Sequence, residues 1–421
     1  MLIIDSKTTV RDIDRWGTLI DPAEIYLEVR KIDQYNPVEV ISIIQFLISN
    51  AGFNNQNSFI LGIEVEELRS LPKDYDSYVH LLSLILFDRN GSFKLPNGRH
   101  LLTTDLFENF INKLRDQENL YTTEFEGPTR DEVSSRDMKR VLFPSRDLVR
   151  RRKGVSIFIP CFDHLRQQRL HRTEYFYTEN NFKDEENVAI WMRRLFRYNK
   201  IKIELSNSIA DLAVMVKELM QNTHDWARST FDDSSFILPN LRACYLNLML
   251  SYGSNADNLT TFDIVQQYLR NVLDSDQNTL RLEGMQGRIF DDSELGVCEV
   301  SVIDSGPGMA CRILERDIND ISFEDEAAAI IKCFHKYITS ETGGRRQLRG
   351  KGLSKIIKLI KNKGLLRVRT GRVLLIRDFL LNPLSDSEVM NGNLTFKVDS
   401  GLMPVKGTTI TVLYPFVYSM T

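Results

Sequence analysis

An acid, an amide and a second acid recur at helical spacing in residues 217–227, KELMQNTHDWA. Glu218, Asn222 and Asp225 stand at positions i, i+4 and i+7, so on a helix their side chains share one face about two turns long. A carboxylate can take a proton from water, and an amide oxygen is a hard ligand that suits Mg²⁺. The pattern indicates chemistry on water or a metal; the alternative is a solvated polar face.

The flanking residues predict the helix that would position these side chains. Apolar residues recur at helical spacing and would bury the opposite stripe of the helix, namely Ile209, Leu212, Val216, Leu219 and Met220. The helix would therefore show packing residues on one side and the three polar residues on the other.

A second candidate group follows a predicted strand. Residues 296–303 (GVCEVSVI) alternate in the manner of a strand and lead directly into Asp304, Gly306 and Gly308. The carboxylate can accept a hydrogen bond from a ligand amino group, and the glycines let the backbone approach a ligand closely. A DxGxG sequence is weak evidence alone, because any turn can contain it.

A basic loop at residues 339–353 precedes a predicted helix at 354–362. Its Gly350 and Gly352 form a Gly-x-Gly, and free N–H groups at a helix start attract phosphate. Basic side chains add positive charge to the loop, namely Arg345, Arg346, Arg349 and Lys351. The alternative is a solvated surface loop.

The remaining C-terminal segments predict strands and helices around these motifs. Residues 241–250 fit a strand or a short helix, and helices are expected at 262–273 and 324–337. Two short strands flanking Thr370-Gly371 predict a hairpin. Gly407-Thr408 precedes a closing strand at 410–414, which we expect Pro415 to end.

Composition limits the class of protein. The chain has 421 residues, 42% of them hydrophobic and 26% charged, which is typical of a folded protein of two domains. A net charge of −3 gives no overall argument for nucleic acid or an anionic membrane. The five cysteines lack CxxC or zinc spacing, and no signal peptide or membrane-spanning run is visible. We therefore expect a cytoplasmic protein with reduced thiols and no membrane association.

Residues 1–207 predict a mainly helical and mixed domain of unknown role. Helices are expected at 38–49, 75–87, 105–120 and 191–198, with a buried strand at 154–160. The run Arg150–Lys153 carries enough charge to touch a phosphate backbone, although a solvated loop is the simpler explanation. His164 and His171 lack the spacing and third ligand of a metal pair, so we interpret them as surface or packing residues.

In chain order, the motifs are ExxxNxxD on a helix, DxGxG after a strand, GxG before a helix and Gly-Thr before a last strand. Together, over residues 208–415, they resemble the ATP-binding domain of the GHKL superfamily, which includes gyrase, Hsp-type chaperones, histidine kinases and MutL. The resemblance implies an α/β (α+β) chain whose residues 208–421 form a Bergerat-type sandwich. In such a sandwich, helices cover one face of a mixed, mainly antiparallel sheet. ATP and Mg²⁺ are the implied cofactors.

The resemblance implies a role for each matching residue. Glu218 would activate the hydrolytic water, Asn222 would bind Mg²⁺ and Asp225 would line the nucleotide pocket. Asp304 would accept from the adenine amino group, and Thr408 would reach the adenine side. Gly306 and Gly308 would shape the pocket floor and the lid hinge. The phosphates would lie against the end of the basic loop, namely Arg349, Gly350, Lys351 and Gly352.

Three departures from the family pattern affect these expectations. Trp226 follows Asp225, where many members of the family have alanine, so the pocket wall is expected to differ. The stretch at 228–295 is longer than compact members need and predicts an insertion that serves a partner. The basic loop at 339–353, which would be the lid, lacks a long glycine-rich string, so the resemblance does not say in detail how its residues would contact the phosphates.

The expected function is that of a Mg²⁺-dependent ATPase in which lid closure switches an interaction. The partner would be another protein or a second copy, held through residues 1–207 or the insertion. One alternative is histidine-kinase-type phosphotransfer, although His164 and His171 lack the acid and proline that would follow a phosphoacceptor. Another is a MutL- or MORC-like nucleic-acid-associated ATPase that uses Arg150–Lys153.

Overall fold

The computed structural model describes most of the C-terminal half of the chain and parts of the N-terminal half. The described residues are 2–4, 25–27, 45, 49, 92–94, 100–102, 154–162, 176–178, 181–198, 201–203, 206–237, 240–249, 264–273, 294–334, 352–385, 388 and 394–420. Outside them lie the helices predicted at 75–87 and 105–120, Arg150–Lys153, His164, His171, Arg349, Gly350 and Lys351.

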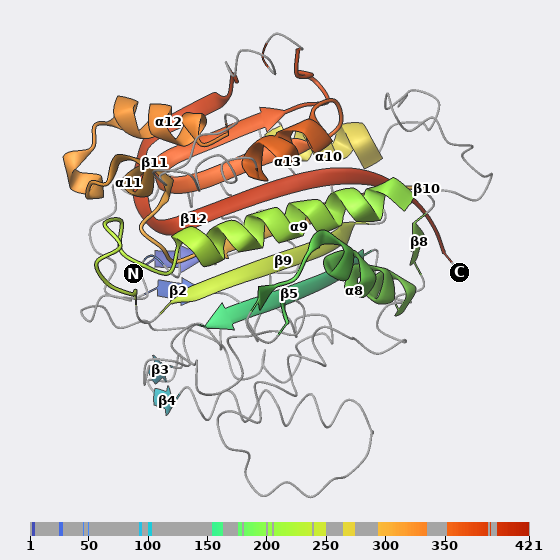
Figure 1. The fold of residues 1–421 in the computed structure, drawn as a ribbon, viewed down its shortest axis with the longest axis horizontal. Coiled ribbons are helices and arrows are strands. Elements are labelled where there is room, and N and C mark those ends of the chain that lie inside the picture. Colours follow the sequence, from blue (N-terminus) through green and yellow to red (C-terminus); the bar gives the residue numbers. More distant parts are fainter. Residues whose placement is uncertain are drawn as a thin grey trace, which may run out of the picture.

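Helices and strands alternate irregularly along this part of the chain (Figure 1). The helices are α8 (Glu185–Tyr198), α9 (Ser206–Trp226), α10 (Ile264–Leu273), α11 (Met309–Leu314), the 3₁₀ turn η6 (Ile318–Asp320), α12 (Phe323–Lys332) and α13 (Gly352–Ile360). The main strands are β5 (Gly154–Phe162), β8 (Ile201–Ile203), β9 (Leu241–Met249), β10 (Glu294–Asp304), β11 (Leu365–Asp378) and β12 (Lys397–Met420). Short strand pairs are β1 (Leu2–Ile4) with β2 (Ile25–Leu27), β3 (Ser92–Lys94) with β4 (His100–Leu102), and β6 (Tyr177–Thr178) with β7 (Asn181–Phe182).

One sheet organises these elements. Its strand order is β11-β12-β10-β9-β5, and β8 pairs with the far end of β12. Each pairing described in this sheet is antiparallel. The expected α+β class is therefore confirmed. β5 and β8 precede residue 208, so the predicted division at 207 falls between strands of one sheet.

Apolar residues at helical spacing attach α9 to one face of the sheet. Leu212, Val216 and Leu219 are buried in a core with alternate residues of β10 and β12, such as Val300 and Val412. α9 lies across this face, with α8 beside it (Figure 1). The helix predicted from the periodicity is thus present and holds its polar residues at a fixed place on the sheet.

The expectation that helices cover only one face is corrected by α10. Its Val265, Leu269 and Val272 form a separate core with Val297 and Leu413, which are on the side of the sheet opposite their neighbours in the α9 core. Since α10 has a strongly amphipathic sequence, it needs an apolar surface, and this end of the second face supplies one.

The predicted hairpin at Thr370-Gly371 is wrong. β11 is one strand that pairs with β12 on both sides of Gly371, with an irregular register at that point. Gly371 has a φ of +52°, which here produces a bulge rather than a reversal of the chain. Whether such a glycine turns or bulges depends on the neighbouring strand, and β12 runs beside both halves.

Pro415 also does not end the last strand, contrary to expectation. β12 continues through it to Met420, and Pro415 pairs with Val297 of β10. The pairing of β12 with β11 stops at Leu413, so β11 requires no N–H from the proline.

Two residues from the helix expected at 38–49 contact the sheet. Both are helical, and the Ser49 hydroxyl donates to the Gln45 carbonyl over 2.7 Å. The buried Gln45 Nε2 donates to the carbonyl of Arg369 over 3.0 Å, and Ser49 Oγ accepts from the N–H of Lys406 over 2.8 Å. These contacts connect the N-terminal region to β11 and β12 next to the residues described below.

Candidate functional site

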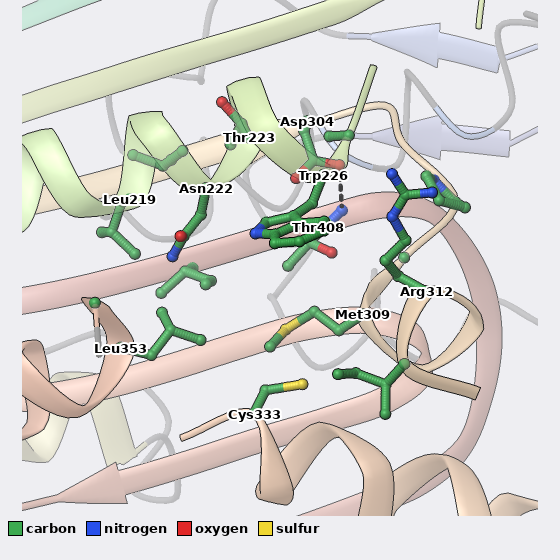
Figure 2. Close-up of a pocket in the computed structure, with 17 residues that line it drawn as sticks. Leu219, Asn222, Thr223, Trp226, Asp304, Met309, Arg312, Cys333, Leu353 and Thr408 are labelled. Atoms are coloured by element: carbon green, nitrogen blue, oxygen red, sulfur yellow. Dashed lines mark hydrogen bonds between the residues drawn. The ribbon is translucent and has the colours of Figure 1, made fainter. Parts of the chain in front are cut away.

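A cavity of about 140 Å³ lies between α9, the end of β10, α11, the start of α13 and β12. Figure 2 shows its lining side chains converging from these separate elements. Five of the predicted site residues line it, namely Asn222, Asp304, Gly308, Gly352 and Thr408. Glu218, Asp225 and Gly306 are not among its lining residues.

Strand register explains why distant polar residues meet here. β10 and β12 pair Ile303 with Thr409, which brings the end of β10 beside Thr408. β11 and β12 pair Thr370 with Thr408. The carboxylate of Asp304 and the hydroxyls of Thr370 and Thr408 therefore gather at one end of the sheet, and Figure 2 shows Asp304 beside Thr408.

Asp304 is a nearly buried carboxylate with one occupied oxygen. Its Oδ1 accepts from the N–H groups of Gly306, over 2.9 Å, and Thr408, over 3.2 Å. Within the described residues, no hydrogen bond reaches Oδ2. Burial raises the pKa of Asp304 to about 6, although the two N–H donors and the charge of Arg242 oppose this shift. The residue can thus offer Oδ2 as an acceptor inside the cavity at neutral pH.

Glycines make the approach of these segments possible. A Cβ on Gly306 would lie 2.7 Å from Ala227, where the turn after β10 packs on the end of α9. A Cβ on Gly407 would lie 1.8 Å from the carbonyl oxygen of Asp304. The DxGxG turn and the Gly-Thr pair therefore need glycine because backbones meet there. Gly306 supports the cavity wall rather than lining it.

Thr370 and Thr408 connect the floor of the cavity to the turn above it. Their hydroxyl oxygens are 3.1 Å apart, and Thr370 Oγ1 also donates to the carbonyl of Gly407. The N–H of Met309 donates to Thr370 Oγ1 over 3.2 Å, which fixes the first turn of α11. Thr370 was assigned to a hairpin turn from sequence, so this contact was missed.

Glu218 lies beside the cavity in contact with α13. Its Oε1 accepts from Lys355 Nζ at 2.7 Å and from Lys217 Nζ at 3.2 Å. A Cβ on Gly352 would lie 2.6 Å from its Oε2, so that oxygen faces a lining residue. The Lys355 pKa is raised, first by this hydrogen bond to Glu218, and Lys355 also contacts Glu185. The carboxylate is thereby held at the start of α13.

Asn222 and Asp225 differ in their relation to the cavity. Asn222 is one turn beyond Glu218 on α9, and its side chain lines the cavity (Figure 2). Asp225 is half-buried near the end of the helix. Among the described residues, no group of three or more His, Cys, Asp or Glu side chains is placed to hold a metal ion. The amide oxygen of Asn222 is one side-chain oxygen on the cavity wall that a cation could use, and the Asp304 carboxylate is another.

Two large side chains of the cavity have no role assigned from sequence, although Trp226 is expected there to change the pocket wall. Trp226 lies four residues after Asn222, a spacing that does place it on the same helix face, and it lines the cavity together with Arg312 of α11. The Arg312 guanidinium carbon lies 5.6 Å from the centroid of the Trp226 ring. No spacing in the sequence connects Arg312 to this helix, since only the fold brings α11 to it.

Comparison with family models, curated proteins and solved structures finds no match for this chain. None of the helices in the described ranges combines the length and apolar character that crossing a membrane requires.

Proposed function

We propose that this chain is a Mg²⁺-dependent ATPase of the GHKL type, with a Bergerat-type nucleotide-binding unit in its C-terminal half. The observation that supports this proposal is the convergence of four motifs, far apart in sequence, on one cavity. Each motif contributes one residue to the cavity wall. These residues are Asn222 from the ExxxNxxD helix, Asp304 from the DxGxG turn, Gly352 from GxG and Thr408 from the Gly-Thr pair.

The cavity suits the base of an adenine nucleotide. An apolar cavity of about 150 Å³ holds a benzene ring, so a cavity of about 140 Å³ has room for the six-membered ring of adenine, which carries the amino group. Oδ2 of Asp304 would accept from the exocyclic amino group, which adenine carries and guanine lacks at the corresponding position. The sugar and phosphates would extend toward Gly352 at the start of α13.

The residues present also fit a magnesium ion. Mg²⁺ keeps several waters and is held through few protein oxygens together with substrate phosphates, so the amide oxygen of Asn222 would be the direct contact of the protein with the ion. The bound ion would neutralise charge on the phosphates. This fit does not require a cluster of carboxylates.

In the proposed reaction, Glu218 takes a proton from the attacking water. The water oxygen forms a bond to the γ-phosphorus, the bond to the β–γ bridging oxygen breaks, and ADP leaves. The two lysines on Oε1 leave Oε2 to receive the proton. Closure of the basic loop before α13 would then switch contact with a partner protein or a second copy.

Calorimetric titration with Mg²⁺ and a non-hydrolysable ATP analogue tests the binding part of this proposal. The wild type should bind the adenine analogue and discriminate against the guanine analogue. Asp304→Asn should weaken adenine binding, because the amide oxygen would keep the bonds from the N–H groups of Gly306 and Thr408 and leave an NH₂ donor facing the base. Absence of binding by a folded wild-type protein would refute the proposal.

Turnover is tested separately with two acids that contact the same lysine. Glu218→Gln should retain binding and lose ATP hydrolysis. Glu185→Gln removes the other contact of Lys355, on an exposed part of α8, and should retain hydrolysis. Unchanged hydrolysis in the Glu218 variant would remove the role assigned to that carboxylate.

A further inference from the structure

Trp226 forms an aromatic wall of the cavity. It comes from the last turn of α9, one turn beyond Asn222, and is half-buried. In the view of Figure 2 the indole lies between Asn222 and Arg312, and Asp304 and Met309 line the same cavity. A flat aromatic surface is therefore adjacent to a carboxylate that has one acceptor oxygen available.

The position of the indole is supported by a fixed guanidinium. Arg312 is 6% exposed and lies over the Trp226 ring at 5.6 Å from its centroid. Its Nη1 donates to the carbonyl of Thr230 over 2.6 Å, and its Nη2 donates to Ser229 Oγ over 3.0 Å. Its Nη2 also pairs with Asp233 at 2.5 Å. Arg312 is therefore held at one face of the ring.

The loop that holds Arg312 is itself ordered by its own hydrogen bonds. Thr230 and Ser235 are joined by an N–H to carbonyl bond of 2.9 Å, and Ile237 donates to the carbonyl of Arg228 over 2.9 Å. Ser229 and Phe236 form a β-bridge. Residues 228–237 belong to the stretch that the sequence marked as an insertion. In the fold, residues of this stretch hold Arg312, which lines the cavity.

We propose that Trp226 stacks on the base of the bound nucleotide. This inference rests on the proposed function and adds a specificity-determining residue to it. The cavity has room for the six-membered ring of the base, the indole supplies a stacking surface, and Asp304 supplies an acceptor at the edge of that ring. The ligand class is accordingly a 6-aminopurine, selected by its ring as well as by the hydrogen bond from the amino group that guanine lacks at that position.

Intrinsic fluorescence tests the contact directly, because Trp226 is one of three tryptophans in the chain. Mg²⁺-ATP and adenosine should both change the tryptophan emission. Inorganic tripolyphosphate, which has the phosphates and no base, should leave it unchanged. In Trp226→Phe, the ligand-dependent change should disappear while affinity stays within about threefold, because phenylalanine still stacks.

Affinity gives the second measurement. Removal of a stacking side chain weakens base binding by roughly fivefold to 150-fold, so Trp226→Ala should show a loss of at least about fivefold by calorimetry. A melting curve checks that Trp226→Ala is folded. If that variant is unfolded, the fluorescence titrations of the wild type and of Trp226→Phe decide whether Trp226 stacks on the base.

The outcomes separate this inference from the proposed function. If wild type binds ATP with no change in emission, and Trp226→Ala binds equally well, stacking is refuted and the ATPase proposal stands. An emission change with tripolyphosphate alone would also overturn stacking. If wild type binds no adenine nucleotide, both fail together.

Discussion

Two glycines on β12 offer a matched test of the close approach that builds the cavity. Gly407 and Gly401 have φ values of +73° and +75°, so alanine would be strained to a similar degree at either position. A Cβ on Gly407 would lie 1.8 Å from the carbonyl oxygen of Asp304, whereas a Cβ on Gly401 would have no atom of the described residues within 4 Å. The pair thus separates backbone strain from steric overlap.

The expected magnitudes follow from this geometry. Alanine in the left-handed region costs about 1–2 kcal/mol, and Gly401→Ala should lower the free energy of unfolding by that amount alone. Gly407→Ala adds an overlap with backbone atoms, which only movement of a strand can relieve. Overpacking of this kind costs roughly 1–3 kcal/mol more, so we expect a total loss of about 2–5 kcal/mol.

Urea unfolding of both variants measures these losses, and nucleotide calorimetry measures the consequence for the site. Relief of the overlap must displace Asp304 relative to Thr408, so Gly407→Ala should also weaken binding of the ATP analogue. Gly401→Ala should bind as the wild type does. Equal losses of stability in the two variants would refute the inferred contact between Gly407 and Asp304.

Burial raises the pKa of Glu299 from 4.5 to about 8. The protonated carboxyl therefore contributes its full stability below the pKa of the unfolded chain, and this contribution is lost as pH rises through about 8. Glu299→Gln should flatten the pH dependence of the free energy of unfolding measured in urea, and parallel curves for variant and wild type would contradict this. Glu326 is fully buried, and its carboxylate accepts from the backbone N–H of Arg372 over 2.7 Å and from Arg372 Nε over 2.8 Å. Glu326→Ala should lower the free energy of unfolding by about 3–5 kcal/mol. Glu185→Ala, which removes an exposed ion pair with Lys355, should lower it by less than about 1 kcal/mol. Similar losses in the two variants would count against the buried contact. Since the pKa of Asp304 is raised to about 6, affinity for the ATP analogue should fall about tenfold per pH unit below that value in calorimetry; an equal fall in Asp304→Asn would assign it to another group.

Much of the local structure was predictable because periodicity is a local property. The helix at residues 206–226, the strand at 294–304 and the helix at 264–273 follow from spacings of apolar residues that the sequence displays directly. The sequence does not decide between a strand and a short helix for residues 241–249, because a short apolar run is compatible with either. Contact with β10 and β5 on its two sides decides for a strand.

The errors share a different cause. Gly371 and Pro415 carry strong local signals for a turn and a strand end, and both are overridden by the strands beside them. A glycine at positive φ serves a bulge as well as a turn, and a proline is tolerated where no partner needs its N–H. Such outcomes depend on neighbours far away in sequence.

The sequence by itself determined which residues can share a face, because the backbone repeat sets the distance between Glu218 and Asn222 within one helix. It also indicated that Asp304 follows a strand and that Gly352 opens a helix. Only the tertiary structure decided that these residues surround one cavity, that Glu218 is held by Lys355, and that Arg312 lies over Trp226. Spacing within an element is set by local dihedral angles, whereas distances between elements are set by strand register and side-chain packing, which no short stretch of sequence contains.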